Sequence, residues 1–417
     1  MIDILQEIYS TIRMNKMRTF LTGFAVAWGI FILIVLLGSG NGILNAFEES
    51  ANRTNIRTIT LYPSFTNVPH GGFQRGRAIK LDETDITVLN SELNDYLSSE
   101  SGLIDQSNIT FKNDDHIITG QLKGVSTGYQ KNAAIEIILG RFINQDDLKE
   151  KRRTLVIHEK AIPLLFGKEI DPIGKSINVN KLNFLIVGVY KDKGFNNYRD
   201  FYCPIATVKQ IYNADKFANV SFISKNINSL EKSEKLTNDI REVLARKKIY
   251  SPNDKGAIWI SNQFTFFLQQ QSASGYLRIA IWVIGIFTLL SGIVGVSNIM
   301  LISVKERTRE FGIRKAIGAK PNSILRLILV ESVIITTFFG YIGMFAGVLA
   351  TEWMNYKAGN KVLDAGVFSQ TVFSNPTVDI NIAIQATLTL IIAGTIAGFI
   401  PARKAVSVKP IEALNAR

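Results

Sequence analysis

Long stretches without charge constrain the fold of this chain more than any other feature of its sequence. No charged residue lies between Arg278 and Lys305, and only Glu331 interrupts the apolar run 327–351. Two further runs, 20–37 and 380–400, carry no charge at all. An α-helix of about 20 apolar residues crosses the hydrocarbon core of a bilayer, which is roughly 30 Å thick. We therefore expect four membrane-spanning helices.

Composition agrees with this expectation mainly through clustering. The apolar fraction of 47% in 417 residues is ordinary for a globular chain, but here it is concentrated in runs. The net charge of +12 is spread along the chain, and no basic stripe with interleaved aromatic residues argues for nucleic-acid binding. The single cysteine, Cys203, excludes an intramolecular disulfide. The three histidines, His70, His116 and His158, lie far apart in sequence and have no metal-ligand spacing.

Basic residues orient the helices, because loops rich in lysine and arginine stay in the cytoplasm. Residues 305–320 carry two acidic side chains, Glu306 and Glu310, against six basic ones: Lys305, Arg307, Arg309, Arg314, Lys315 and Lys320. Basic residues also precede the first apolar run and follow the fourth: Arg13, Lys16, Arg18, Arg403, Lys404 and Lys409. We expect this loop and both ends of the chain in the cytoplasm, and residues 45–275 outside.

The expected fold class is an α-helical membrane protein with four transmembrane helices and a large α+β extracytoplasmic domain between helices 1 and 2. The amphipathic segment 1–18 lies in the membrane interface or simply extends the first helix. The expected order of segments is transmembrane helix 1 (19–44), the outer domain (45–275), transmembrane helix 2 with a stalk (276–304), the cytoplasmic loop (305–324), transmembrane helix 3 (325–351), a short outer segment (352–379), transmembrane helix 4 (380–402) and the cytoplasmic tail (403–417).

The outer domain has a mixed α/β pattern. We predict a helix over 82–97 with Asp82 as its N-cap, a charged surface helix over 230–248, and a hairpin over 177–190 that turns near 180–183. Strands are also predicted over 56–61 and 257–260. This order suggests a subdomain that is split by a β-rich insertion.

The cytoplasmic loop has an unusual helical wheel. If it is helical, Arg307, Phe311, Arg314 and Lys315 share one face, and Ile313, Ala316 and Ile317 share the opposite one. An aromatic side chain ringed by cations is suited to docking on a partner protein. The alternative is that the basic residues only fix topology and contact lipid headgroups. Gly312 weakens the helix.

Glu331 is the one carboxylate inside an apolar run, at the inner edge of the third expected helix. A carboxylate inside a membrane is a functional candidate by default. Its interfacial depth favours a plainer role, in which it holds the loop through a cation such as Arg326 or Lys305.

A phosphate-binding loop is not found. Gly174-Lys175-Ser176 imitates the end of one, but the pattern requires glycine where Glu169 stands. We therefore expect that this chain is not an enzyme and does not hydrolyse ATP by that route, and that it holds no cofactor or metal.

The run 298–331, NIMLISVKERTREFGIRKAIGAKPNSILRLILVE, resembles the signature of MacB/FtsX-type permeases of ABC transporters. Residues 140–147, 155–189 and 201–212 resemble the MacB-like extracytoplasmic domain, and 401–404 with 411–414 resemble the C-terminal signature of the family. The resemblance implies an outer domain of two lobes, one membrane-proximal (about 45–111 and 219–275) and one inserted (about 112–218). It also implies a coupling helix that rests on a cytoplasmic ABC ATPase. The coupling positions are Glu306, Arg307, Thr308, Arg309, Glu310, Gly312, Arg314, Lys315, Gly318 and Ala319, to which the wheel adds Phe311.

Function follows from the resemblance and from the uncharged helices, which offer no polar path for a pore. The resemblance implies mechanotransmission in a bacterial inner membrane, with ATP and Mg²⁺ bound by the partner ATPase and a second permease copy completing a homodimer. The favoured function is export from the periplasm with a periplasmic adaptor and an outer-membrane duct. The alternatives are a lipoprotein-releasing permease and an FtsX-like scaffold that activates cell-wall hydrolases. Co-purification of an adaptor and duct, or of a hydrolase alone, would discriminate between export and scaffold.

Overall fold

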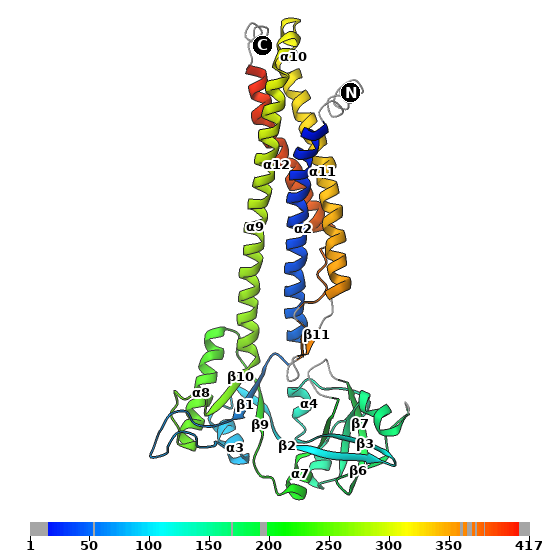
Figure 1. The fold of residues 1–417 in the computed structure, drawn as a ribbon. Helices are drawn as coiled ribbons and strands as arrows, with labels where there is room; N and C mark the ends of the chain where they lie inside the picture. The colour runs from blue at the N-terminus through cyan, green and yellow to red at the C-terminus, as the bar shows by residue number, and fades with distance from the viewer. Residues whose placement is uncertain are drawn as a thin grey trace. The chain divides into compact units, whose positions relative to one another are not determined.

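The computed structural model describes residues 16–52, 55–167, 170–191, 198–358, 362–364, 369–371, 373–378 and 380–407. Most of the amphipathic segment 1–18 and most of the tail 403–417 therefore lie outside the described residues. The chain divides into two compact units (Figure 1). The helical unit comprises Met1–Phe47, Ala273–Leu363 and Thr371–Arg417, and the α/β unit comprises Glu48–Ser272 and Asp364–Gln370.

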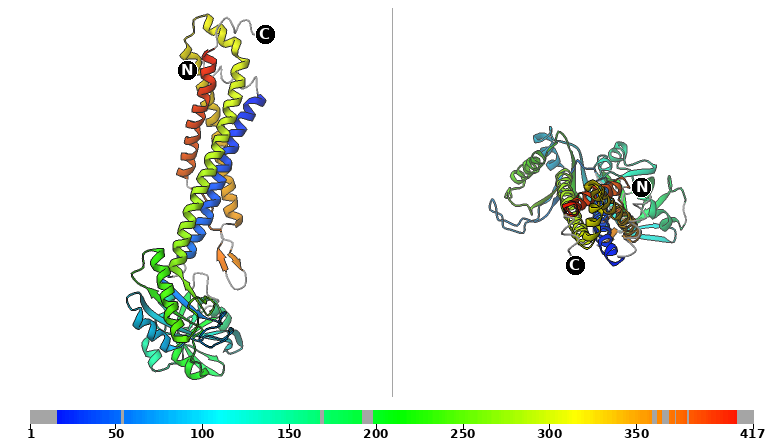
Figure 2. Two further views of the ribbon diagram at one scale, coloured as in Figure 1. Left: turned by 90° about the vertical axis from the view of Figure 1, so that its left-hand side faces the viewer. Right: turned by 90° about the horizontal axis from the view of Figure 1, so that it is seen from above.

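Long helices form over each apolar run of the sequence, and they lie side by side in the helical unit (Figure 2). They are α2 (Lys16–Asn52), α9 (Gln263–Glu306), α11 (Pro321–Ala358) and α12 (Ile380–Ser407), with the short α10 (Thr308–Ala316) between α9 and α11. Among the described residues, α2, α9 and α11 are long and apolar enough to cross a membrane. Helix α9 is one helix of 44 residues and begins at Gln263, before the expected segment 276–304.

Small residues bring α2 and α11 close together. A Cβ atom added to Gly343 of α11 would overlap the backbone carbonyl of Ala27 in α2. Close backbone approach at small residues is typical of helix packing in membranes, where dispersion contacts replace the hydrophobic driving force. Ser332 of α11 adds a hydrogen bond from its hydroxyl to the carbonyl of Gly394 in α12, at 3.3 Å. The helical unit is therefore tightly packed around α11.

The outward sides of these helices carry large apolar side chains. Phe24, Trp28 and Phe345 are about half exposed or more, and the rings of Phe24 and Trp28 stack at 5.8 Å. Such surfaces suit contact with lipid rather than water.

One ten-stranded sheet organises the α/β unit. Its order is β10-β1-β9-β2-β3-β8-β5-β7-β4, and β6 pairs with both β2 and β7. The strands are β1 (Thr58–Pro63), β2 (Leu97–Asn113), β3 (His116–Val125), β4 (Glu136–Gly140), β5 (Thr154–His158), β6 (Ser176–Val179), β7 (Leu182–Lys191), β8 (Asp200–Pro204), β9 (Asn219–Ser224) and β10 (Ile258–Asn262). The helices are α3 (Glu83–Glu92), α4 (Tyr129–Asn132), α5 (Gln145–Lys149), η1 (Glu159–Ala161), α6 (Ile162–Phe166), α7 (Ile205–Tyr212) and α8 (Leu230–Lys248). A separate pair joins β11 (Val362–Asp364) and β12 (Ser369–Thr371).

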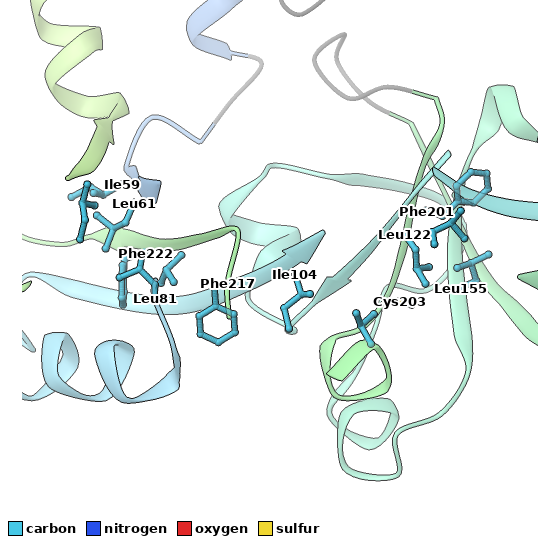
Figure 3. Close-up of a cluster of buried hydrophobic side chains, with 14 of the residues drawn as sticks. Ile59, Leu61, Leu81, Ile104, Leu122, Leu155, Phe201, Cys203, Phe217 and Phe222 are labelled. Atoms are coloured by element: carbon cyan, nitrogen blue, oxygen red, sulfur yellow. The ribbon is translucent and has the colours of Figure 1, made fainter. Parts of the chain in front are cut away.

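The sheet separates two hydrophobic cores, because successive side chains of a strand point to opposite faces. Phe201 of β8 joins the larger core, part of which Figure 3 shows, with Ile59 and Phe222 from β1 and β9. Its neighbour Tyr202 joins the smaller core, with Tyr190 and Phe142. Both faces of the central strands are thus buried.

Strand β2 is the longest in the sheet. It pairs with β9 through Leu97–Leu103 and with β3 from Leu103 to Asn113. Its register shifts between Ser98 and Ser101 and again between Gln106 and Ile109. Ser99 and Asn108 lie at these shifts with positive φ angles of 49° and 59°, which is typical of β-bulges.

Most local predictions for residues 45–275 are confirmed. Asp82 caps α3 in a capping box with Asp85, β6 and β7 form the predicted hairpin, and α8 has the predicted bounds. Two details are wrong. Helix α3 ends at Glu92 rather than 97, because residue 97 already belongs to β2. Helix α8 is not only a surface helix, since Leu236, Ile240 and Leu244 are buried in the larger core.

Candidate functional site

The charged loop between the second and third apolar runs folds as a helical hairpin. Helix α9 ends at Glu306, α10 occupies Thr308–Ala316, and α11 begins at Pro321. Gly318 turns the chain between α10 and α11 with a φ of 101°, a conformation that favours glycine. Proline then starts α11, where its missing N–H costs nothing.

A buried ion pair joins this loop to α11. Nη1 of Arg307 lies 3.1 Å from Oε2 of Glu331, and the two side chains are 14% and 7% exposed. Glu331 thus holds the loop through a cation, as predicted, but this contact is made by Arg307 and not by Arg326 or Lys305. The sequence reasoning missed it because it placed Arg307 on an outward face.

Glu310 extends the ion pair along α10. Arg307 donates from Nε to one oxygen of Glu310 at 3.0 Å, and Arg314 donates from Nη2 to the other at 2.8 Å. Burial raises the pKa of Glu310, but the hydrogen bonds and charges of Arg307 and Arg314 outweigh it and hold that pKa below its usual range. Charges of alternating sign therefore run from Arg314 through Glu310 and Arg307 to Glu331.

Helix α12 is also attached to α10. The ammonium group of Lys315 donates a hydrogen bond to the carbonyl of Val406, in the last turn of α12. Carbonyls at a helix C-terminus have no partner within their own helix, so a lysine is a suitable donor there. Arg307, the N-cap residue of α10, thus contacts α11, and Lys315 of α10 contacts α12.

Phe311 lies inside the helical unit. It is 1% exposed, and the guanidinium of Arg307 lies over its ring at 5.2 Å. The prediction that Phe311 forms an exposed knob for docking is therefore wrong. The wheel grouped the residues correctly, but the bond from Arg307 to Glu331 turns that face inward.

The opposite face of the loop is exposed. Ile317 is 82% exposed and Ile313 is 41% exposed. We call this surface the α10 outer face: Lys305, Arg309, Ile313, Ile317 and Lys320, all exposed. Arg309 and Ile313 lie one turn apart on α10, Lys305 lies at the end of α9, and Ile317 and Lys320 follow α10 in sequence.

The other predicted coupling residues fall into two groups. Gly312 is buried beside Phe311, and the hydroxyl of Thr308 donates to the carbonyl of Val304 at 3.1 Å. Glu306 and Gly318 are exposed, and Ala319 is partly buried. Within the described residues, no three His, Cys, Asp or Glu side chains gather as a metal site would require.

Comparison with known proteins gives the relationship. Residues 19–243 match the family described as MacB-like periplasmic core domain, and residues 282–410 match the FtsX-like permease C-terminal family. A macrolide export ATP-binding/permease protein MacB of Bdellovibrio bacteriovorus is 27% identical over 100% of this chain and 62% of its own length. A MacB of Chlorobaculum tepidum is 26% identical over 98% of this chain and 60% of its own length. The chain thus spans about 60% of the length of these relatives.

Solved structures also resemble part of the chain. The crystal structure of the periplasmic region of MacB from Actinobacillus actinomycetemcomitans aligns with 54% of this chain and 97% of its own, with 23% identity and a TM-score of 0.42. The extracellular domain of the noncanonic ABC-type transporter YknZ from Gram-positive bacteria aligns with 49% of this chain and 100% of its own, with 20% identity and a TM-score of 0.40. The two matched families together account for most of the sequence, and the chain therefore belongs to the MacB/FtsX-type family of ABC transporter permeases.

Proposed function

We propose that this chain is the permease subunit of a MacB-like ABC transporter and that a separate cytoplasmic ATPase docks on the α10 outer face. The observation that supports this is the two-sided character of α10. Its inner side is anchored by Arg307 and Lys315 to α11 and α12, while Ile313 and Ile317 are exposed. A helix that is fixed on one side and apolar on the other is suited to receive a force from a partner.

The chemistry of the outer face specifies the partner's surface. Apolar side chains at the centre of an interface carry most of the binding energy, and charges at its rim steer association. Two exposed isoleucines flanked by Arg309, Lys305 and Lys320 fit an apolar groove with an acidic rim. The docking residues of our proposal are therefore those of the outer face rather than Phe311.

Helix continuity supports transmission of this force. Helix α10 is linked through the chain to α9 and α11, and α9 continues without a break to Gln263, directly after β10. At 1.5 Å per residue, its 44 residues form a rod of roughly 66 Å. In our proposal ATP hydrolysis on the partner moves α10, and α9 relays that movement to the α/β unit.

The remaining features of the proposal are topological. We propose that α12 is a fourth membrane span, that the protein is a multi-pass protein of the bacterial inner membrane, and that the α/β unit lies in the periplasm as two lobes. The sheet order supports two lobes, since β3 to β8 gather on one side of β2 while β1, β9 and β10 lie on the other. Two permease copies would work with two ATPase subunits, a periplasmic adaptor and an outer-membrane duct. The substrate would be taken from the periplasm for export.

A site-specific cross-linking experiment tests docking. A photoreactive amino acid in place of Ile317 should capture an ABC ATPase subunit in membranes of the source cell. The same amino acid in place of Ile342, a half-exposed residue of α11, is the matched control and should capture none. Ile317→Asp should abolish co-purification of the ATPase without lowering the amount of inserted permease. Capture of the ATPase from position 342 but not from 317 would contradict the proposal.

A further inference from the structure

A hairpin arm, residues 64–80, lies between β1 and α3 in the α/β unit. Isolated β-bridges pair its two sides, and His70 and Phe73 exchange two backbone hydrogen bonds of 3.0 Å. Gly71 and Gly72 form the tip between them, with φ angles of 57° and 84°. Two positive φ angles in succession are what a type I′ turn requires, and glycine adopts them without strain. The arm therefore has a defined conformation.

Both sides of the arm are fastened to the rest of the α/β unit. On one side, the buried carboxylate of Asp254 accepts hydrogen bonds from the backbone N–H groups of Asn67 and Val68, at 2.7 and 3.1 Å. On the other side, Nη2 of Arg77 donates to the last carbonyl of α8 and to the carbonyl that follows it, each at 2.6 Å. The guanidinium of Arg77 also lies over the ring of Phe73, at 4.1 Å. These contacts hold the arm in place.

The arm nevertheless exposes most of its own surface, including its apolar side chains. Of residues 64–80, all of them described, only Thr66 and Ile79 are buried. Phe65 is 60% exposed, Val68 is 45% exposed and Phe73 is 42% exposed. Apolar surface in water is unfavourable, and exposed apolar groups gathered on one rigid element are typical of an interaction site.

The charge of the arm has one sign. No aspartate or glutamate occurs between Pro63 and Leu81, whereas Arg75, Arg77 and Lys80 do. Arg75 and Lys80 are exposed, and neither has an ion pair within the part of the chain that the structure describes. Their charges are therefore not neutralised locally, and the arm presents a positive field beside its apolar side chains.

We propose that the arm docks a partner protein whose surface has an apolar hollow with an acidic rim. Aromatic side chains and arginine are enriched where interfaces concentrate binding energy, and complementary charge at the rim selects the partner. A second copy of the arm does not fit, because two cationic arms repel each other. A lipid surface does not need a fixed backbone, whereas docking on a protein gains affinity from a preorganised one.

The partner is a different protein from the ATPase that we assign to the α10 outer face. This step rests on the proposed function, which places the α/β unit in the periplasm and the ATPase in the cytoplasm. The arm itself is argued from its own contacts, exposure and charge, so its docking role does not depend on what α10 binds.

Helix α8 connects the arm to the start of α9. The arm is bonded to the C-terminal end of α8, and the side-chain amide of Asn262 donates to the hydroxyls of Ser233 and Thr237 in its first turns, each at 3.0 Å. The other side-chain atom of Asn262, Oδ1, accepts the N–H of Thr265 in α9 at 3.2 Å. The 19 residues of α8 span roughly 28 Å. A partner on the arm is thus one helix away from the relay proposed for α9.

Photo-cross-linking in the source cell is the first part of the test. A photoreactive amino acid replaces Phe65 in the full-length protein, and the same amino acid in place of Ile117 of β3 is the matched control, because both side chains are 60% exposed. We expect position 65, but not 117, to capture one protein, through a segment that contains aspartate or glutamate.

Charge reversal is the second part. The captured protein is purified and titrated against the full-length permease in nanodiscs. Arg75→Glu with Lys80→Glu should weaken binding by about tenfold or more, since two attractions become repulsions. Lys232→Glu with Lys235→Glu is the control, because it makes the same change of net charge with two exposed lysines near the other end of α8. That control should bind like the wild type.

Four results would overturn the proposal: no capture from position 65, capture of phospholipid alone, capture of another copy of this chain alone, or equal weakening by the two double variants. If R75E/K80E does not fold, Arg75→Gln with Lys80→Gln gives the same comparison with a smaller loss of binding. Failure here is distinct from failure of the proposed function, because capture of the ATPase from position 317 does not involve the arm.

Discussion

Replacing Glu331 by Gln tests the anchor of α10 most directly. The substitution removes the negative charge from the buried pair with Arg307, whose atoms are 3.1 Å apart. Removing one partner of a buried ion pair costs about 3–5 kcal/mol, because the other charge is left without compensation. Arg307 keeps its bond to Glu310 and is 14% exposed, so we expect the lower end, about 3 kcal/mol.

Hydrogen exchange of the α10 amides measures this cost in the full-length protein in nanodiscs. Since about 1.36 kcal/mol is a factor of ten, a loss of about 3 kcal/mol accelerates exchange roughly 150-fold. Glu310→Gln is the matched control, because Glu310 also binds Arg307 but its side chain is 40% exposed. An exposed pair contributes up to about 1 kcal/mol, so this control should accelerate exchange by roughly fivefold at most.

Comparison of the two variants tests whether the ion pair between Arg307 and Glu331 anchors α10. If E310Q matched or exceeded E331Q, the pair with Glu331 would not be the anchor of α10. A double substitution, Arg307→Met with Glu331→Leu, should exchange more slowly than E331Q, because no buried charge is then left alone. Faster exchange in the double variant would show that the contact matters by its specific geometry and not through uncompensated charge.

Two other regions of the chain yield predictions. Gly343→Ala should lower the melting temperature of the detergent-solubilised protein, because the added Cβ would overlap Ala27. Gly275→Ala in α9 is the control: its Cβ meets no neighbouring atom, so the change should be neutral or slightly stabilising. Equal melting temperatures of the two variants would refute the close contact. Burial raises the pKa of Asp147, but hydrogen bonds from Arg141 and the backbone of Asn144, with the charge of Arg152, outweigh burial and hold that pKa below its usual range. The ionised Asp147 therefore stabilises the folded state at neutral pH, and this stabilisation is lost as pH falls through the folded pKa. Asp147→Asn should therefore lower the stability of the α/β unit at neutral pH and reduce the further loss of its stability in acid. Both are measured by urea unfolding of the full-length protein, with labelling of the buried Cys203 as the readout at each pH. A loss of stability in acid as large as that of the wild type would contradict this.

Local signals in the sequence predicted much of the fold. Helix α8 was bounded correctly from its run of charged residues, and in the structure Ser229 caps its start. The β6–β7 hairpin was predicted from a turn near residues 180–183 and the apolar residues that follow it, and Asn180 and Lys181 have positive φ angles in that turn. The long apolar helices followed from uncharged length alone.

Features that depend on distant residues were beyond these signals. The orientation of α10 is set by Glu331, which lies 24 positions from Arg307. Helical spacing shows which side chains share a face, but it does not show which face is buried. Strand β2 was missed as well, because its first half is rich in serine and its partners β9 and β3 fix it as a strand.

The length of β2 has a mechanical consequence. Strand β2 belongs both to the part of the sheet that contains β9 and to the part that contains β3. These two parts therefore cannot separate as rigid bodies unless β2 loses hydrogen bonds to β9 or β3. Deformation is cheapest where pairing is already interrupted, at the bulges beside Ser99 and Asn108. A force on this unit would therefore twist the sheet, and the sheet would deform first at the two bulges.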